Sequence, residues 1–431
     1  MKWFQQSYWQ KEGFLRQVST LVSGTVLAQV FSLLILPVLG VQYQSAAFGL
    51  QGLFIAVIHS LAIAVNGGYE VAIMLPKQTQ AAKALLWLCV LLATLLSLLV
   101  GVGLLFGGTW FWTLLKTPEM VDWQWWLLGG LWVEGLAQPI RVLFNRLKLY
   151  RALSISRMMQ AFVGGGVMLA LGYLEVGFFG LLIGYVAGQI ASLLLLMIRF
   201  LRWQAQINFP VSLADCLAVA RTYRDFPTRS LWAGWLNTVS RQLPFYLLPS
   251  FFSQEIAGYY TMTNRALMAP FSLLSRSVGE VFYERAARAK ERGKAALASL
   301  TRQTATYLSL VGLLPFLVVM VAAPFVVQWF LGESWYPSGE YARYLMPWIY
   351  LMFIASPLSY LIDVQRRLDF LFWYNVALFL VRLSALLMGG WYFSAGQTVL
   401  LYGAMGGLMV AFHIGFLLKI GHVWEEAQKV G

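Results

Sequence analysis

The chain has 431 residues, of which 59% are hydrophobic, 16% aromatic and only 11% charged, and its mean hydropathy is +0.68. Soluble domains carry about 25% charged residues, so this composition excludes a soluble enzyme, a disulfide-rich secreted scaffold and a disordered chain. Lysine and arginine together number 31 against 18 acidic residues, which gives a net charge of +13. Such a basic chain suggests nucleic-acid binding, unless the positions of the charges explain the excess.

The N-terminus predicts a segment that lies on the membrane surface. Residues 1–16 mix five aromatic side chains with Lys2, Lys11 and Glu12, a combination typical of interfacial segments. The apolar run that follows has no small-residue cleavage site and is too long for the apolar region of a signal peptide. We therefore expect a first spanning helix there.

About 20 apolar residues cross a bilayer as a helix, and the chain contains twelve such stretches. They are 17–41, 48–75, 83–106, 122–145, 153–174, 177–201, 218–249, 256–282, 301–331, 341–364, 369–392 and 397–420. The longest stretches between them, 202–217 and 283–300, are polar and charged. We predict an all-α polytopic membrane protein with twelve transmembrane helices.

The positions of the basic residues predict the orientation. With both termini in the cytoplasm, three arginines fall inside spans and only Lys116 and Arg343 in outward loops, which leaves 26 of the 31 basic residues on the cytoplasmic side. This asymmetry follows the positive-inside rule. A nucleic-acid partner is therefore unnecessary, and anionic lipid of the inner leaflet is the expected partner of these charges.

An internal repeat divides the spans into two halves. Residues 45–75 align with 254–284 at a shift of 209–210. Because each half has an even number of spans, the halves share one orientation, as in parallel-repeat transporters. We predict an N-terminal six-helix bundle over 17–205, a cytoplasmic linker over 206–217 and a C-terminal six-helix bundle over 218–431, arranged around a central cavity.

Small residues at intervals of four predict close helix packing. Gly180, Gly184 and Gly188 share one face of the sixth predicted span, and Gly403 and Gly407 share one face of the twelfth. Glycines at this spacing let two helix backbones approach each other in a membrane.

Three arginines inside predicted spans are the candidate substrate-binding residues: Arg241, Arg265 and Arg382. An arginine at mid-membrane costs about 2.5–3.5 kcal/mol unless it faces water or a partner. The planar guanidinium matches a phosphate or a carboxylate. The arginines indicate a site for an anionic head group, and the alternative is a set of buried ion pairs with acidic residues.

Five titratable residues are candidates for ion coupling or gating: Glu134, His59, Glu70, Glu280 and Asp363. Glu134 lies near mid-membrane and is either a titratable coupling group or an arginine partner. His59 is either a proton carrier or simply hydrogen-bonded. Glu70 and Glu280 occupy equivalent positions in the repeat, where they form either a salt-bridged gate or ordinary helix-end pairs. Asp363 is a further partner for an arginine. We expect no cofactor, and H⁺ or Na⁺ as the coupling ion.

Two groups of segments carry a resemblance to a known family. Thr20–Gln29, Ala47–Leu50 and Tyr69–Lys77 closely resemble, in combination, the N-terminal signature of the Wzx-like polysaccharide flippases, and Gly258–Arg265 resembles its counterpart in the second half. This family belongs to the superfamily of multidrug, oligosaccharidyl-lipid and polysaccharide transporters. The resemblance places Arg265 at the family's arginine position.

The resemblance implies a V-shaped fold of two six-helix bundles like that of the multidrug exporters. It also implies a flippase in the bacterial inner membrane. The cargo would be an undecaprenyl-diphosphate-linked oligosaccharide, such as an O-antigen, capsule or exopolysaccharide unit, carried from the cytoplasmic to the outer leaflet by alternating access. An ion gradient or the membrane potential would drive transport, and a polysaccharide polymerase with its chain-length machinery would be a partner.

Two other functions are consistent with a polytopic membrane protein. A cation-coupled multidrug exporter would have the same fold, but intramembrane arginines disfavour cationic drugs as cargo. A membrane-bound glycan polymerase or glycosyltransferase is the alternative of another class. The chain has no Asp-x-Asp motif, and His59, His413 and His422 form no catalytic pattern, so we expect no enzyme.

Overall fold

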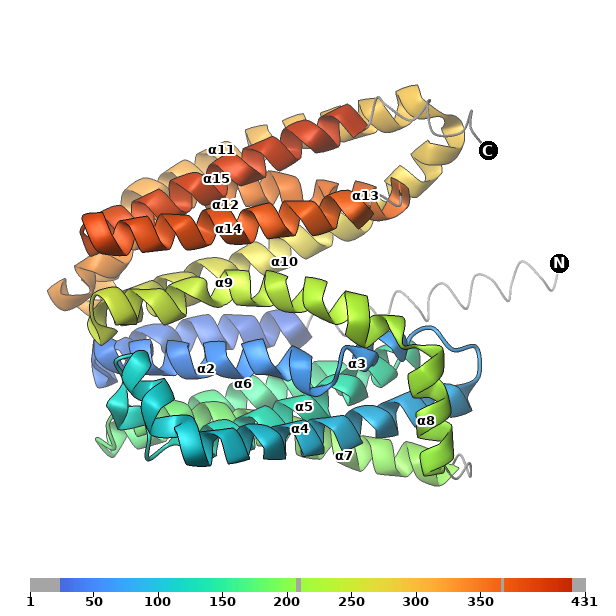
Figure 1. The fold of residues 1–431 in the computed structure, drawn as a ribbon. Helices are drawn as coiled ribbons and strands as arrows, with labels where there is room; N and C mark the ends of the chain where they lie inside the picture. Colours follow the sequence, from blue (N-terminus) through green and yellow to red (C-terminus); the bar gives the residue numbers. More distant parts are fainter. Residues whose placement is uncertain (1–23, 207–210, 366–367, 421–431) are drawn as a thin grey trace. The chain divides into compact units, whose positions relative to one another are not determined.

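The computed structural model describes residues 24–206, 211–365 and 368–420, whose regular structure is helical throughout (Figure 1). The chain divides into two compact units, Met1–Gln242 and Leu243–Gly431. The first unit contains a helix at Gly24–Gln42, α2 (Ser45–Val65), α3 (Tyr69–Ala72), α4 (Thr79–Leu114), η1 (Pro118–Met120), α5 (Gln124–Arg146), α6 (Tyr150–Tyr173), α7 (Phe179–Gln206), α8 (Leu213–Thr222), η2 (Phe226–Ser230) and the first part of α9 (Leu231–Phe251). The second contains the rest of α9, then α10 (Gln254–Arg292), α11 (Lys294–Leu331), η3 (Glu333–Trp335), α12 (Tyr336–Leu358), α13 (Tyr360–Gln365), α14 (Leu368–Tyr392) and α15 (Ala395–Ile420).

The predicted all-α membrane class is confirmed. Nine helices in the described parts of the chain are long and apolar enough to cross a membrane. The three other predicted spans correspond to α5, α9 and α10, which have 23, 21 and 39 residues and are more polar. The predicted interfacial segment 1–16 lies outside the described residues, and the predicted linker 206–217 lies partly outside them.

The surface of the long apolar helices requires lipid. The most apolar windows of α4 and α11 both have a hydropathy of 2.7, yet only 33% and 17% of these windows are buried inside the protein. A helix that is apolar on all sides and exposed is stable only in an apolar solvent. These two helices therefore present lipid-facing surfaces.

The predicted span 48–75 is wrong beyond Val65, because α2 ends there and the chain turns before α3. Gly67 and Gly68 have φ angles of +62° and +74°, a backbone region that glycine adopts without a steric penalty. A Cβ atom added to Gly68 would lie 3.3 Å from the Cβ of Leu231. The glycine pair thus ends the helix inside an apolar stretch of sequence.

The predicted span 218–249 is also wrong, because it joins two helices. A capping box closes the start of α8, where the Asp215 amide donates to the Ser212 hydroxyl and the Ser212 amide to the Asp215 carboxylate. The π-helical turn η2 then connects α8 to α9. The long helix of this stretch is α9, and the short α8 packs against α4.

The stretch 283–300, expected between spans, is helical. Helix α10 continues to Arg292 and α11 begins at Lys294, so Gly293, with φ of +105°, is the only break. Six alanines fall between residues 283 and 300, and alanine has the highest helix propensity. The two helices therefore form a hairpin that continues beyond their apolar segments.

The packing of each unit follows the predicted glycine faces. In the first unit, a Cβ on Gly188 of α7 would lie 2.5 Å from the Gln160 carbonyl oxygen of α6, and α5 contacts α2, α4, α6 and α7. In the second unit α12 contacts α10, α11 and α15, and a Cβ on Gly403 would lie 3.0 Å from the Tyr344 carbonyl oxygen. Both predicted glycine faces therefore pack closely against neighbouring helices.

Replacing Gly68 tests the turn between α2 and α3. The G68A variant should lose about 1 kcal/mol of stability, because alanine at positive φ is strained. A lower melting temperature of the purified protein in detergent would show this loss. Gly166→Ala is the matched control, because a Cβ at this helical position meets no atom within 4 Å. Equal melting temperatures for G68A and the wild type would contradict the role of the turn.

Candidate functional site

Polar side chains of the first unit gather along one face of α5. Glu134, Gln138 and Arg141 follow each other at intervals of four and three residues, a spacing that puts them on one side of a helix. The Arg141 guanidinium forms an ion pair with the Glu134 carboxylate. We call these three residues the α5 polar stripe. The arginine that pairs with Glu134 belongs to the same helix and is not one of the three predicted arginines, and a coupling role for Glu134 stays a prediction.

The stripe reaches Glu70 of α3 through its middle residue. The Gln138 amide nitrogen donates to the Glu70 carboxylate at 3.5 Å, and Glu70 is only 3% exposed. Burial raises the pKa of this carboxyl from 4.5 to about 7, because the charged form loses its hydration. Glu70 can therefore exchange a proton near neutral pH.

Neighbouring side chains hold α3 in place. The Arg146 guanidinium donates to the carbonyl oxygens of Ile73 at 3.1 Å and Met74 at 3.0 Å, and also to that of Pro76. The Tyr69 hydroxyl donates to the Ala220 carbonyl oxygen of α8 at 3.2 Å. The carbonyl groups that follow the end of α3 are thereby satisfied.

His59 of α2 lies within the same polar region. Its Nε2 is 3.5 Å from the Tyr185 hydroxyl of α7, which accepts a hydrogen bond of 3.0 Å from the Gln189 amide. The charges of Glu134, Arg141 and Arg241 all act on His59. Two of the predicted coupling residues, His59 and Glu134, are therefore within the range of electrostatic interaction, as is Arg241 in the middle of α9.

In the second unit, Arg382 lies in the middle of α14 and is only 4% exposed. Its guanidinium carbon is 5.1 Å from the ring centroid of Trp348 on α12. The Trp348 and Tyr402 rings meet edge to face at 5.5 Å, and the charge of Arg382 also acts on Tyr260 and Tyr374. A desolvated cation–π contact contributes about 2 kcal/mol, which offsets most of the 2.5–3.5 kcal/mol that an arginine costs at this depth.

Arg265 is half-buried on α10. Two residues before it, the Thr263 hydroxyl contacts Ser338, at 2.7 Å from the carbonyl oxygen and 2.9 Å from the hydroxyl. This fixes α10 against α12. Arg241, by contrast, is exposed. The three predicted arginines thus differ in environment, and Arg241 belongs to the first unit, although the sequence placed it with the other two in the C-terminal half.

Two predicted acids, Glu280 and Asp363, remain to be located in the fold. Glu280 and Asp363 lie in α10 and α13, but their side chains are outside what the structure describes. Gln138 and Arg141 were not predicted, although the helical spacing from Glu134 could have revealed them. Trp348, over which Arg382 lies, was not predicted either, because it belongs to another helix and leaves no local signal.

Replacing Glu70 tests the buried carboxyl. Because the folded-state pKa of about 7 exceeds the ordinary 4.5, the folded chain binds more protons than the unfolded chain between these values. The contribution of Glu70 to the free energy of unfolding is therefore largest below about pH 4.5. It is lost as the pH rises through 7, a loss on the order of 3 kcal/mol in total. Melting temperatures measured from pH 5 to 8 should fall less steeply in E70Q than in the wild type. The exposed Glu333→Gln should keep the wild-type slope, and an unchanged slope in E70Q would contradict the assignment.

A double-mutant cycle tests the ion pair of the stripe. Glu134→Gln and Arg141→Gln should each lower the stability by about 2 kcal/mol, because each leaves a partly buried charge without its partner. The double variant should lose clearly less than the sum of the two. Denaturant unfolding of the four proteins gives the coupling energy, and strictly additive losses would show that the pair contributes nothing.

The fold is similar to those of solved membrane transporters. The lipid II flippase MurJ in an inward closed conformation has a TM-score of 0.71 at 11% identity, over 92% of this chain and 87% of that one. An inward-facing multidrug resistance MATE family transporter of the MOP superfamily has a TM-score of 0.66 at 14% identity, over 92% and 96%. An outward-facing one has a TM-score of 0.61 at 12% identity, over 96% and 97%. At these identities the similarity shows the fold, and it confirms the predicted fold class.

The sequence comparisons identify the family. The chain matches no curated protein. Residues 43–340, more than half of the chain, match the family model described as polysaccharide biosynthesis protein. The chain is therefore a multi-pass membrane protein that belongs to the polysaccharide biosynthesis protein family.

Proposed function

We propose that this protein is a flippase that moves a polyprenyl-diphosphate-linked oligosaccharide from the cytoplasmic to the outer leaflet of the bacterial inner membrane. The observation that carries the proposal is the presence of arginines in the middle of α9 and α14, two long helices of a polysaccharide biosynthesis protein. Family membership points to a glycan, and the depth of the arginines points to an anionic group inside the membrane. A glycan linked to a lipid through a diphosphate has both properties.

The arginines suit the diphosphate in different ways. Arg241 is exposed and Arg265 half-buried, so both can reach a ligand without a change in the fold of their own unit. Arg382 lies over Trp348 and would leave this contact for the phosphates only when α12 and α14 shift. Bidentate guanidinium–phosphate bonds would replace the hydration that the diphosphate loses. Meanwhile the polyprenyl chain stays in lipid.

The membrane potential and a proton can both drive the cycle. A diphosphate carries about two negative charges, and moving them outward across ~100 mV, inside negative, gains roughly 4–5 kcal/mol. Glu70 is the coupling group that we favour, because Glu134 is already paired with Arg141 while Glu70 is buried with a pKa of about 7. Protonation would remove the buried charge beside Gln138 and so favour one state of α3.

The proposal also assigns the protein an orientation in the membrane and a partner. With both termini in the cytoplasm, the basic residues at helix ends lie against the anionic inner leaflet. The protein acts without a cofactor and delivers lipid-linked units to a polysaccharide polymerase. Among the described residues, no cluster of three or more His, Cys, Asp or Glu could hold a metal ion.

Replacing Arg265 tests the function. R265A should abolish the export of surface polysaccharide while the protein stays at its normal level in the membrane, because the head group loses its guanidinium partner. R265K keeps the charge but not the bidentate geometry, so it should restore export only in part. Surface polysaccharide is quantified by immunoblot or sugar analysis, and protein by its own immunoblot.

The matched control for this test is Arg302→Ala, an exposed arginine on α11 that should export normally. Normal surface polysaccharide in R265A would overturn the proposed role of Arg265. Export of a cationic drug by the wild type, with no effect on polysaccharide in a deletion strain, would instead favour the multidrug exporter.

A further inference from the structure

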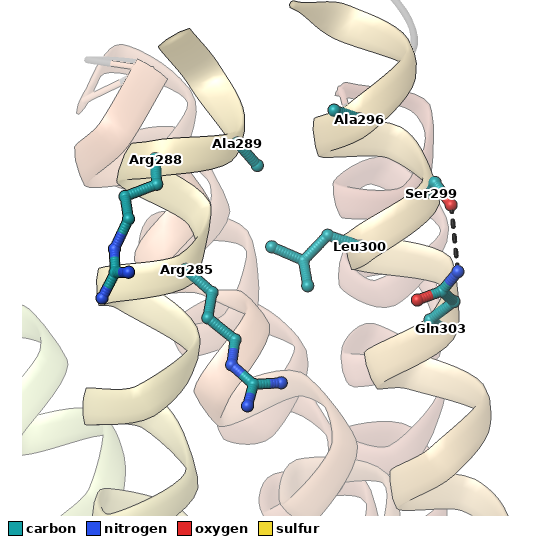
Figure 2. A pocket seen from close by; sticks show the side chains of 7 residues that line it. All are labelled: Arg285, Arg288, Ala289, Ala296, Ser299, Leu300 and Gln303. Atoms are coloured by element: carbon teal, nitrogen blue, oxygen red, sulfur yellow. Dashed lines mark hydrogen bonds between the residues drawn. The ribbon is translucent and has the colours of Figure 1, made fainter. Parts of the chain in front are cut away.

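A groove opens between α10 and α11, near the hairpin at Gly293. It has two connected parts, with cavity volumes of about 330 and 560 Å³, which share Arg285, Leu300 and Gln303. Figure 2 shows Arg285 of α10 and Leu300 of α11 pointing into the space between the two helices. The combined volume lies in the range of small-molecule sites.

The two parts of the groove differ in chemistry. The larger part is lined by Val278, Val281, Phe282 and Tyr307 and is mainly apolar. The smaller part is lined by Arg285, Arg288 and Ser299, toward the hairpin. The groove is therefore amphipathic along its length, with an apolar end and a cationic end.

The surface of α11 shows where the membrane boundary crosses the groove. Ser299, Arg302 and Gln303 are exposed and polar. From Tyr307, 65% exposed, to Phe330, 52% exposed, the large exposed residues are apolar and include Leu310, Leu314 and Trp329. These 24 residues span about 36 Å at 1.5 Å each, and aromatic residues stand at both ends, as they do at membrane interfaces. The apolar end of the groove thus lies at the edge of the hydrocarbon, and the cationic end at head-group depth.

The arginines at the cationic end are not equivalent. Arg288 forms an ion pair with Glu284 of its own helix, and both side chains are exposed. No hydrogen bond or ion pair to another described residue is found for Arg285. Ser299 and Gln303 of α11 also line the groove, and the Gln303 amide nitrogen donates to the Ser299 hydroxyl at 3.1 Å (Figure 2). Arg285 therefore offers a guanidinium to a ligand from one wall, and polar side chains line the other.

We propose that this groove binds an anionic glycerophospholipid, with its phosphate at Arg285 and Gln303 and the start of an acyl chain along Val281, Phe282 and Tyr307. Charge complementarity and depth both favour this occupant: a phospholipid phosphate sits just outside the hydrocarbon, where Arg285 lies. A soluble phosphate would leave the apolar part in contact with water. The groove lies within the second unit, and this binding is independent of the cargo of the transporter.

The test is lipid binding to the purified full-length protein in detergent, counted by native mass spectrometry. Phosphatidylglycerol should bind more tightly than phosphatidylethanolamine. Arg285→Gln should weaken phosphatidylglycerol binding roughly ten-fold, since one charged hydrogen bond contributes about 1.5 kcal/mol or more. Arg302→Gln is the matched control, because it removes the same charge from an exposed arginine of α11 that does not line the groove.

Several results would overturn the proposal. Equal losses in R285Q and R302Q would show diffuse attraction by positive charge, and no loss in R285Q would exclude the groove. Displacement of phosphatidylglycerol by glycerol 3-phosphate at equal concentration would indicate a soluble phosphate. Binding of a polyprenyl phosphate in preference to phosphatidylglycerol, lost in R285Q, would indicate the transported lipid. Because R285Q is judged by lipid binding and R265A by export, failure of one proposal leaves the other testable.

Discussion

The absence of water around the apolar helices is the constraint on which the other features of this protein depend. In hydrocarbon every backbone and side-chain polar group needs a partner supplied by the protein. The two units supply these partners differently. The first unit pairs Glu134 with Arg141 on one helix and satisfies the carbonyl groups after α3 with Arg146. The second places Arg382 over the ring of Trp348. Some polar groups then remain available to a ligand or a proton, and the carboxyl of Glu70 is one of them.

The two halves of the repeat have diverged where function is expected. Helices α2 and α10 begin 209 residues apart, at Ser45 and Gln254, in agreement with the shift of the repeat. Helix α2 then breaks at Gly67 and Gly68, whereas α10 has no glycine pair at the equivalent position and continues to Arg292. One copy has become a short buried helix that carries a titratable acid. The other has become a long helix that continues past its apolar segment and forms one wall of a groove.

Hydropathy predicted most of the fold, because a membrane imposes the same length and apolarity on every spanning helix. It failed where a second property decided the structure. The glycine pair that ends α2 lies between apolar residues, and the segment from 283 to 300 is charged but rich in alanine, so helix propensity outweighed polarity. The candidate arginines could be recognised from their depth alone. The contact of Arg382 with Trp348 could not, because Trp348 belongs to another helix, whereas Arg141, the partner of Glu134, could be predicted from the helical spacing.

The contacts of Arg146 have a consequence for the way α3 can move. One guanidinium holds the carbonyl oxygens of Ile73, Met74 and Pro76 together, so these bonds form and break as a group. These carbonyl groups directly follow α3, which ends at Ala72. Any displacement of α3, and of Glu70 with it, must therefore either break the bonds to Arg146 or move Arg146 and the end of α5 as well.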